Sequence, residues 1–160
     1  RADIAFRSEF GAQPLIGIFD SRLLSQAFGN LIKNAAESIE SVERHTGEKG
    51  EILVRAAQTG KTITVEVVDN GRGLPRENRQ RLLEPYMTTR EKGTGLGLAI
   101  VKKIVEDHGG QLQLHDAPSD FYNGRGAMIK IVLPATDGPG GATEVGSSSR
   151  IQDEKVSDGV

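Results

Sequence analysis

Three polar or glycine-rich clusters hold the residue types that could do chemistry in this chain: Asn30 with Asn34, Asp69-Asn70-Gly71-Arg72-Gly73, and Gly93-Thr94-Gly95-Leu96-Gly97-Leu98. Asparagine carbonyls can ligate a hydrated Mg²⁺, which completes its shell with phosphates and water. A carboxylate can accept a hydrogen bond from the exocyclic amine of adenine and would repel the carbonyl oxygen of guanine. Backbone amides at the start of a helix can bind phosphate. Together, in this order, the clusters predict a nucleotide site.

Each cluster alone also has a plainer explanation. Gln26, Asn30 and Asn34 lie one turn apart on a predicted helix, with Glu37 close by, and could form a solvated polar face. Asp-Asn-Gly is a common turn sequence, and the glycine-rich third cluster could be a flexible linker. That cluster is neither a dinucleotide-binding fingerprint nor a P-loop. The nucleotide interpretation therefore depends on the set of clusters and their order.

Length and composition narrow the function classes. The 160 residues suit one domain, and a formal net charge of −2 gives no basic surface for nucleic acid or for a membrane. The chain has no cysteine, which excludes disulfides and thiolate metal sites. It has 20 glycines and begins without Met, so we expect a fragment or a processed product. No segment has the pattern of a membrane span or a signal peptide.

Hydrophobic periodicity predicts the elements that must position these clusters. They are strands at 4–10 and 15–19, a helix from Ser21 to about Arg44, a hairpin of 51–58 with 61–69, a short helix at 76–83, a loop at 88–93, a helix at 96–108, and strands at 112–114 and 128–133. Asp20 is the expected N-cap of the first helix. Residues 1–137 are expected to form the domain, and 138–160 a disordered tail rich in Gly, Ser and charge.

These motifs resemble the ATP-binding catalytic domain of sensor histidine kinases over roughly residues 3–134. Asn30-Leu31-Ile32-Lys33-Asn34-Ala35 is similar to the family's N box, and residues 69–73 are similar to its first glycine box. Leu83-Glu84-Pro85-Tyr86 resembles the F box, and residues 93–99 resemble the second glycine box. The stretch 85–110 is most similar to the nitrogen-regulation branch of NtrY-type kinases.

The resemblance implies an α/β (α+β) two-layer sandwich of the Bergerat type, in which a mixed sheet packs against helices. ATP would lie between the first helix and a lid. The implied roles are Mg²⁺ ligation by Asn34, adenine recognition by Asp69 with Gly71 and Gly73 beside the base, and phosphate binding by the amides of Gly93, Thr94, Gly95, Leu96, Gly97 and Leu98. Thr88, Thr89 and Arg90 would approach the γ-phosphate from the lid. Asn30 would contact the nucleotide, and Asn30 and Arg90 would be the catalytic residues.

Three positions depart from the family pattern. Gln26 stands where many members have His, and Leu83 where the F box often has Phe. Glu37 stands where many relatives have Lys or Arg, so a cation that contacts phosphate is missing there. Lys33 or Arg90 could supply that charge, and spacing alone does not choose between them.

The position of Asn30 separates a kinase from an ATPase. In the gyrase, Hsp90 and MutL ATPases, which this fold also resembles, that helix position is usually Glu, a general base that activates water. An amide cannot accept a proton at neutral pH, so we expect slow hydrolysis and transfer of the γ-phosphoryl group to another acceptor. A GHKL-type ATPase remains the enzymatic alternative. A degenerate binding module without nucleotide affinity is the non-enzymatic one.

A histidine kinase also needs an acceptor histidine. His45, His108 and His115 lack the His-Glu/Asp-x-x-x-Pro context of the family, so we expect loop, helix-end and strand-end positions for them. The expected partners are a separate dimerisation domain of the same protein, which carries the acceptor, and a response regulator. The fragment is expected to be monomeric and unable to autophosphorylate. The full protein is expected to be a homodimer, with this domain on the cytoplasmic side of a membrane-anchored bacterial kinase.

Overall fold

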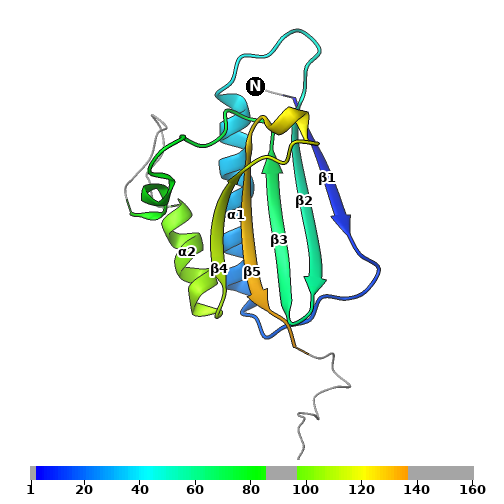
Figure 1. The fold of residues 1–160 in the computed structure, drawn as a ribbon, viewed down its shortest axis with the longest axis vertical. Helices are drawn as coiled ribbons and strands as arrows, with labels where there is room; N and C mark the ends of the chain where they lie inside the picture. Colours follow the sequence, from blue (N-terminus) through cyan, green and yellow to red (C-terminus); the bar gives the residue numbers. More distant parts are fainter. Residues whose placement is uncertain (1–2, 86–96, 137–160) are drawn as a thin grey trace, which may run out of the picture.

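A five-stranded sheet and two α-helices make up the domain (Figure 1). The structure is a computed structural model in which residues 3–85 and 97–136 are described. The elements in chain order are β1 (Ile4–Phe10), α1 (Ser21–Glu40), β2 (Gly50–Thr59), β3 (Thr62–Asp69), the 3₁₀ helix η1 (Arg79–Leu83), α2 (Gly97–Asp107), β4 (Gln111–Asp116), the 3₁₀ helix η2 (Tyr122–Gly124) and β5 (Ala127–Pro134).

The sheet is mixed, as the sequence analysis predicts. Its strand order is β1-β2-β3-β5-β4, with β1 parallel to β2 and every other neighbouring pair antiparallel. The predicted hairpin is β2 with β3, and its turn uses Gly60 at a φ of +60°, a conformation that costs glycine little. The hairpin brings the end of β3 back to the beginning of β2, where Asp69 pairs with Ile52.

Helix α1 begins where its cap predicts. The Asp20 carboxylate accepts hydrogen bonds from the backbone N–H groups of Arg22 and Leu23, both at 3.0 Å. The helix ends at Glu40, about one turn earlier than expected, and the Ser41 hydroxyl donates to the Ser38 carbonyl at 2.7 Å. The residues after this point form a loop that leads to β2.

The main core lies between the sheet and the two helices, which lie on the same face (Figure 1). Side chains that alternate along each strand divide between this core and the opposite face. Ile52 and Val67 belong to the main core, whereas their neighbours Leu53 and Val68 belong to a smaller cluster with Phe121. The smaller cluster fixes the connection between β4 and β5 against the outer face of the sheet.

Two predicted elements are wrong or incomplete. Residues 15–19 form no strand, and the Ile16 carbonyl makes a single backbone hydrogen bond, from Thr136 N–H at 2.8 Å. The helix expected at 76–83 is reduced to η1, because Asn78 adopts a left-handed φ of +59° and a helix cannot run through it. The predicted loop at 88–93 and the predicted tail at 138–160 lie outside the described residues.

The remaining predicted elements are confirmed within a residue or two. Helix α2 and strands β4 and β5 occur where expected. In the part of the chain that the structure describes, no helix combines the length and the apolar character needed to cross a bilayer.

Candidate functional site

Helix α1 presents three polar residues at intervals of four along its length: Asn30, Asn34 and Ser38. Residues four apart lie on one face of a helix, one above the other. Asn30 and Asn34 are half-buried, and Ser38 is 8% exposed. These three side chains form a row on one face of α1, and the other parts of the candidate site contact this row.

The first and third clusters meet at Asn34. A Cβ atom added at Gly97, the first residue of α2, would lie 3.6 Å from both the Oδ1 and the Nδ2 of Asn34. The N-terminus of α2 therefore packs directly against the asparagine side chain. Free backbone amides and the helix dipole favour an anion at such a terminus. The described start of α2 therefore offers backbone amides of the kind that bind phosphate.

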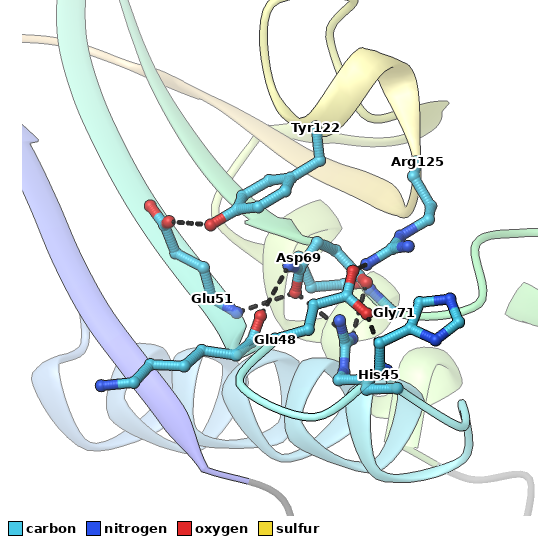
Figure 2. Close-up of polar contacts among 10 residues, drawn as sticks. His45, Glu48, Glu51, Asp69, Gly71, Tyr122 and Arg125 are labelled. Atoms are coloured by element: carbon cyan, nitrogen blue, oxygen red, sulfur yellow. Dashed lines mark hydrogen bonds and ion pairs between the residues drawn. The ribbon is translucent and has the colours of Figure 1, made fainter.

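The second cluster meets α1 one turn further on. Asp69 is the last residue of β3 and is 4% exposed. Its Oδ1 accepts the Gly71 N–H at 2.8 Å, and the carboxyl group also forms hydrogen bonds with the Ala127 backbone and the Ser38 side chain. Figure 2 shows Asp69 and Gly71 at the centre of the surrounding polar contacts.

Asp69 has a strongly altered acidity. Burial raises the pKa of its carboxyl group from 3.8 to about 6, because a charge is costly away from water. The hydrogen bonds from Gly71, Ala127 and Ser38 and the positive charge of Arg44 oppose this rise. At neutral pH the group is thus a buried carboxylate, which is a strong acceptor for a base amine.

Glycines allow the backbone to come this close to α1. A Cβ at Gly71 would lie 2.3 Å from the Ser38 Oγ and 2.6 Å from the Ser38 carbonyl carbon, so no larger residue fits without a shift of the helix. Gly73 has a left-handed φ of +80°, and a Cβ there would lie 3.2 Å from the Gly126 carbonyl oxygen. Both predicted glycine positions therefore have a structural requirement for glycine.

Asn70 is completely buried and holds the neighbouring loop. Its Oδ1 accepts the Glu51 N–H at 2.7 Å, and its Nδ2 donates to the Lys49 carbonyl at 3.2 Å. Its own carbonyl accepts from Arg44 Nη2 at 2.8 Å. The side chain of this motif residue is therefore used inside the protein, and it fixes the loop between α1 and β2 beside Asp69.

Two further contacts close this end of the domain (Figure 2). Arg125 donates to Glu48 at 2.6 Å, and the guanidinium lowers the pKa of the Glu48 carboxyl. The Tyr122 hydroxyl donates to Glu51 at 2.6 Å, and this hydrogen bond raises the pKa of the phenol. They join the α1–β2 loop and the start of β2 to the β4–β5 connection.

The structure brings together a part of the predicted site. The described members of the predicted site lie on three parts of the fold: α1 (Asn30 and Asn34), the end of β3 with the turn after it (Asp69, Gly71 and Gly73), and the start of α2 (Gly97 and Leu98). Lys33 is exposed on α1. The other predicted residues lie outside the described part of the chain, so their contacts stay predictions: Thr88, Thr89, Arg90, Gly93, Thr94, Gly95 and Leu96.

Ser38, which contacts Asp69 from α1, is not predictable as a site residue from its residue type. A serine in a helix is unremarkable by residue type, because such hydroxyls usually face water or the preceding turn. The available signal is its spacing, since it continues the interval of four from Asn30 and Asn34. The contact with Asp69 becomes visible only when β3 is placed beside α1.

The departures from the family pattern have different structural settings. Leu83 is 6% exposed and packs in the main core. Gln26 is exposed near the start of α1, and Glu37 is half-buried on the same helix. Leucine at position 83 therefore serves as a core residue.

The three histidines occupy the expected kinds of position. His45 lies in the loop after α1, and His115 in β4 next to its last residue. The His108 ring lies between two helices, where Nδ1 is 2.8 Å from the Ile104 carbonyl and Nε2 accepts the Asp20 N–H at 2.9 Å. None of the three histidines lies inside a helix.

The donor set at Asn34 is compatible with Mg²⁺. The ion prefers oxygen ligands and needs few from the protein when phosphates are present. The Asn34 carbonyl lies beside the N-terminus of α2. Among the described residues, no group of three or more His, Cys, Asp or Glu side chains could hold a metal alone. Phosphate oxygens and water would therefore complete the shell.

Comparison with known proteins identifies the class. The profile of the histidine kinase-, DNA gyrase B- and HSP90-like ATPase family matches residues 19–137. The chain belongs to this family of ATP-binding domains, and its similar structures place it with the catalytic domains of sensor histidine kinases.

Three relatives illustrate the similarity. The nitrogen regulation protein NtrY of Azorhizobium caulinodans is 56% identical over 121 residues, which are 76% of this chain and 15% of that protein. The mycobacterial sensor histidine kinase MprB has a TM-score of 0.68 at 33% identity, over 83% of both chains. The catalytic domain of the histidine kinase ThkA has a TM-score of 0.68 at 31% identity, over 84% of this chain and 82% of that one.

These findings confirm the predicted family, fold class and similarity to the NtrY branch. The chain spans only 15% to 22% of the length of its curated relatives NtrY and the sensor histidine kinase ZraS of Escherichia coli O157:H7. The remainder of such proteins has no counterpart in this chain.

Proposed function

We propose that this chain holds ATP and donates its γ-phosphoryl group to a histidine on a separate phosphoacceptor domain of the same sensor kinase. The observation that carries the proposal is the arrangement along α1. Asn34 packs against the phosphate-binding start of α2, and Ser38 contacts the base-reading Asp69 one turn away. One helix thus joins both ends of a nucleotide site.

Each end of the site has a defined chemical role. The Asp69 carboxylate accepts a hydrogen bond from the exocyclic amine of adenine, and Gly71 and Gly73 allow the backbone to approach the flat base. The amides at the start of α2 bind phosphate, together with those of residues 93–96. Asn34 ligates Mg²⁺, which supplies charge neutralisation for the phosphates when bound. Arg90 or Lys33 is the proposed cation near the γ-phosphate.

Asn30 supports phosphoryl transfer over hydrolysis. A neutral carboxamide has no basic atom that can take a proton from water, so Asn30 orients groups beside the phosphates without activating water. The position and partners of the three histidines support an acceptor outside this chain.

The remaining assignments follow from the family. We propose that residues 1–137 form the catalytic, ATP-binding domain and residues 138–160 a disordered tail. Its proposed partners are the phosphoacceptor domain and a response regulator. The domain would act on the cytoplasmic side of a membrane-anchored bacterial homodimer, as a monomeric unit when isolated. Similarity to NtrY supports a role in nitrogen regulation.

ATP binding with and without Mg²⁺ tests the site directly. Asp69→Ala removes the acceptor for the adenine amine, so we expect affinity to fall about 10–150-fold, as for a lost hydrogen bond to a charged group. Equal affinity in wild type and variant would contradict adenine recognition by Asp69.

Transfer is tested by adding the cognate phosphoacceptor domain. Wild type should phosphorylate a histidine on it, and Asn34→Ala should abolish transfer. Rapid steady-state phosphate release by the isolated chain would favour the ATPase alternative, and absence of all nucleotide binding would favour a degenerate module.

A further inference from the structure

The geometry points to Ser38 as a positioning residue for adenine recognition: its hydroxyl orients the Asp69 carboxylate for the exocyclic amine of the base. This inference rests on the proposed function, because it gives Ser38 a role that acts through Asp69. It adds a residue from α1 to a recognition element otherwise made by the end of β3 and the turn that follows.

The direction of the hydrogen bonds is fixed by chemistry. Ser38 Oγ accepts the backbone N–H of Arg72 at 3.1 Å. The same hydroxyl is hydrogen-bonded to Asp69, and an ionised carboxylate can only accept. The Ser38 proton therefore points to the carboxylate, and the hydroxyl connects Asp69 with the glycine-rich turn after it.

Ser38 has little freedom to do anything else. It is 8% exposed, and its Oγ lies against Gly71, where an added Cβ would approach to 2.3 Å. The surrounding helix is regular from Ser21 to Glu40, so the hydroxyl is held on a rigid element. Rigid support of this kind is what a recognition group needs to keep one orientation.

The carboxylate receives hydrogen bonds from three separate elements. The turn contributes the Gly71 N–H, β5 contributes the Ala127 backbone, and α1 contributes the Ser38 hydroxyl. Arg44, from the loop after α1, is the charged group that acts on the carboxylate among the described residues. The Ser38 hydroxyl is the one side-chain hydrogen bond in this set, so a single substitution can remove it without altering the backbone.

Loss of the hydroxyl has two consequences. The ionised form of Asp69 loses a donor that favours it, so its protonation begins at higher pH. The carboxylate also loses one of its three orienting contacts. Both consequences weaken acceptance of the adenine amine, and neither alters the groups that bind phosphate.

The experiment compares ADP with the diphosphate of purine riboside, which carries hydrogen in place of the exocyclic amine. Ser38→Ala should weaken ADP binding at pH 7 on the order of tenfold, the scale of one lost hydrogen bond to a charged group. Binding of the amine-free analogue should stay within about twofold. The pH midpoint for ADP binding should also move upward. Ser25→Ala, the same substitution at an exposed position of α1, is the matched control.

The outcomes separate this inference from the proposed function. If Ser38→Ala weakens ADP and the analogue equally, or leaves the pH midpoint in place, Ser38 is a packing residue and the inference is overturned. If wild type binds ADP and the analogue equally well, the adenine-reading role of Asp69 fails first. Selective loss for ADP, with an upward midpoint, supports both.

Discussion

A fall in pH should weaken nucleotide binding by protonating Asp69, and the size of this effect on affinity follows from the pKa of its carboxyl group. Burial places the pKa of this carboxyl at about 6 in the free domain. The proposed recognition of adenine by Asp69 uses the ionised form, because only that form accepts without a proton of its own. The ionised fraction then falls from about 90% at pH 7 to about 10% at pH 5. The affinity for ADP should therefore fall about tenfold over this interval, because free protein must first lose a proton to bind.

Nucleotide binding and proton release by Asp69 are linked, so affinity should fall as the pH falls. Bound adenine stabilises the carboxylate, so binding drives the proton off, and about half a proton per nucleotide should be released at pH 6. Isothermal titration calorimetry in two buffers of different ionisation enthalpy measures this release together with the affinity.

Asp69→Asn is the control, since it keeps the size of the side chain and cannot titrate. Titration of the ADP phosphates and of the three histidines contributes to both profiles, so the difference between the two profiles isolates Asp69. Parallel profiles would refute the reasoning. A wild-type affinity that rises as the pH falls would show that the neutral carboxyl group is the binding form.

Two further predictions concern the backbone of the site. Gly71→Ala forces a Cβ to within 2.6 Å of the Ser38 carbonyl carbon, so it should lower the free energy of unfolding by about 1–3 kcal/mol in urea titrations and weaken ADP binding. Gly29→Ala on α1, where an added Cβ meets nothing within 4 Å beyond the helix's own backbone, should instead raise the free energy of unfolding by about 0.5–1 kcal/mol. Similar losses for both variants would contradict the steric explanation. Asn70→Ala leaves the Glu51 N–H without its 2.7 Å acceptor and should cost about 1–3 kcal/mol, so an unchanged urea midpoint would disprove its clamping role.

Local signals in the sequence predict most of the fold. The apolar stripe of α1 and the capping Asp20 each have a local physical cause, and both are confirmed. The strand predicted for residues 15–19 is wrong, although the apolar residues of this segment are typical of a strand. Ile18 is nevertheless 84% exposed. Among the described residues, the backbone of this segment is hydrogen-bonded only to Thr136, which follows β5. Strand formation depends on a partner, which a local pattern cannot supply.

The candidate site also has a part that local sequence predicts and a part that depends on packing. Glycine spacing and the two asparagines predict its chemistry, because each residue type has a direct use in binding a nucleotide. The contacts of Ser38 and Asn70 depend on how β3 packs beside α1 and the loop after it, at separations of more than 15 residues in the chain. No local pattern encodes such contacts.

The spacing of Asn30, Asn34 and Ser38 sets the length of the site. At a rise of 1.5 Å per residue, Asn34 at the proposed phosphate end and Ser38 at the proposed base end are separated by about 6 Å along α1. One residue inserted between Asn34 and Ser38 would turn one end by about 100° relative to the other. Both ends would then keep their residues but could no longer hold the same molecule. Helix length between these positions is therefore as much a part of nucleotide recognition as the side chains themselves.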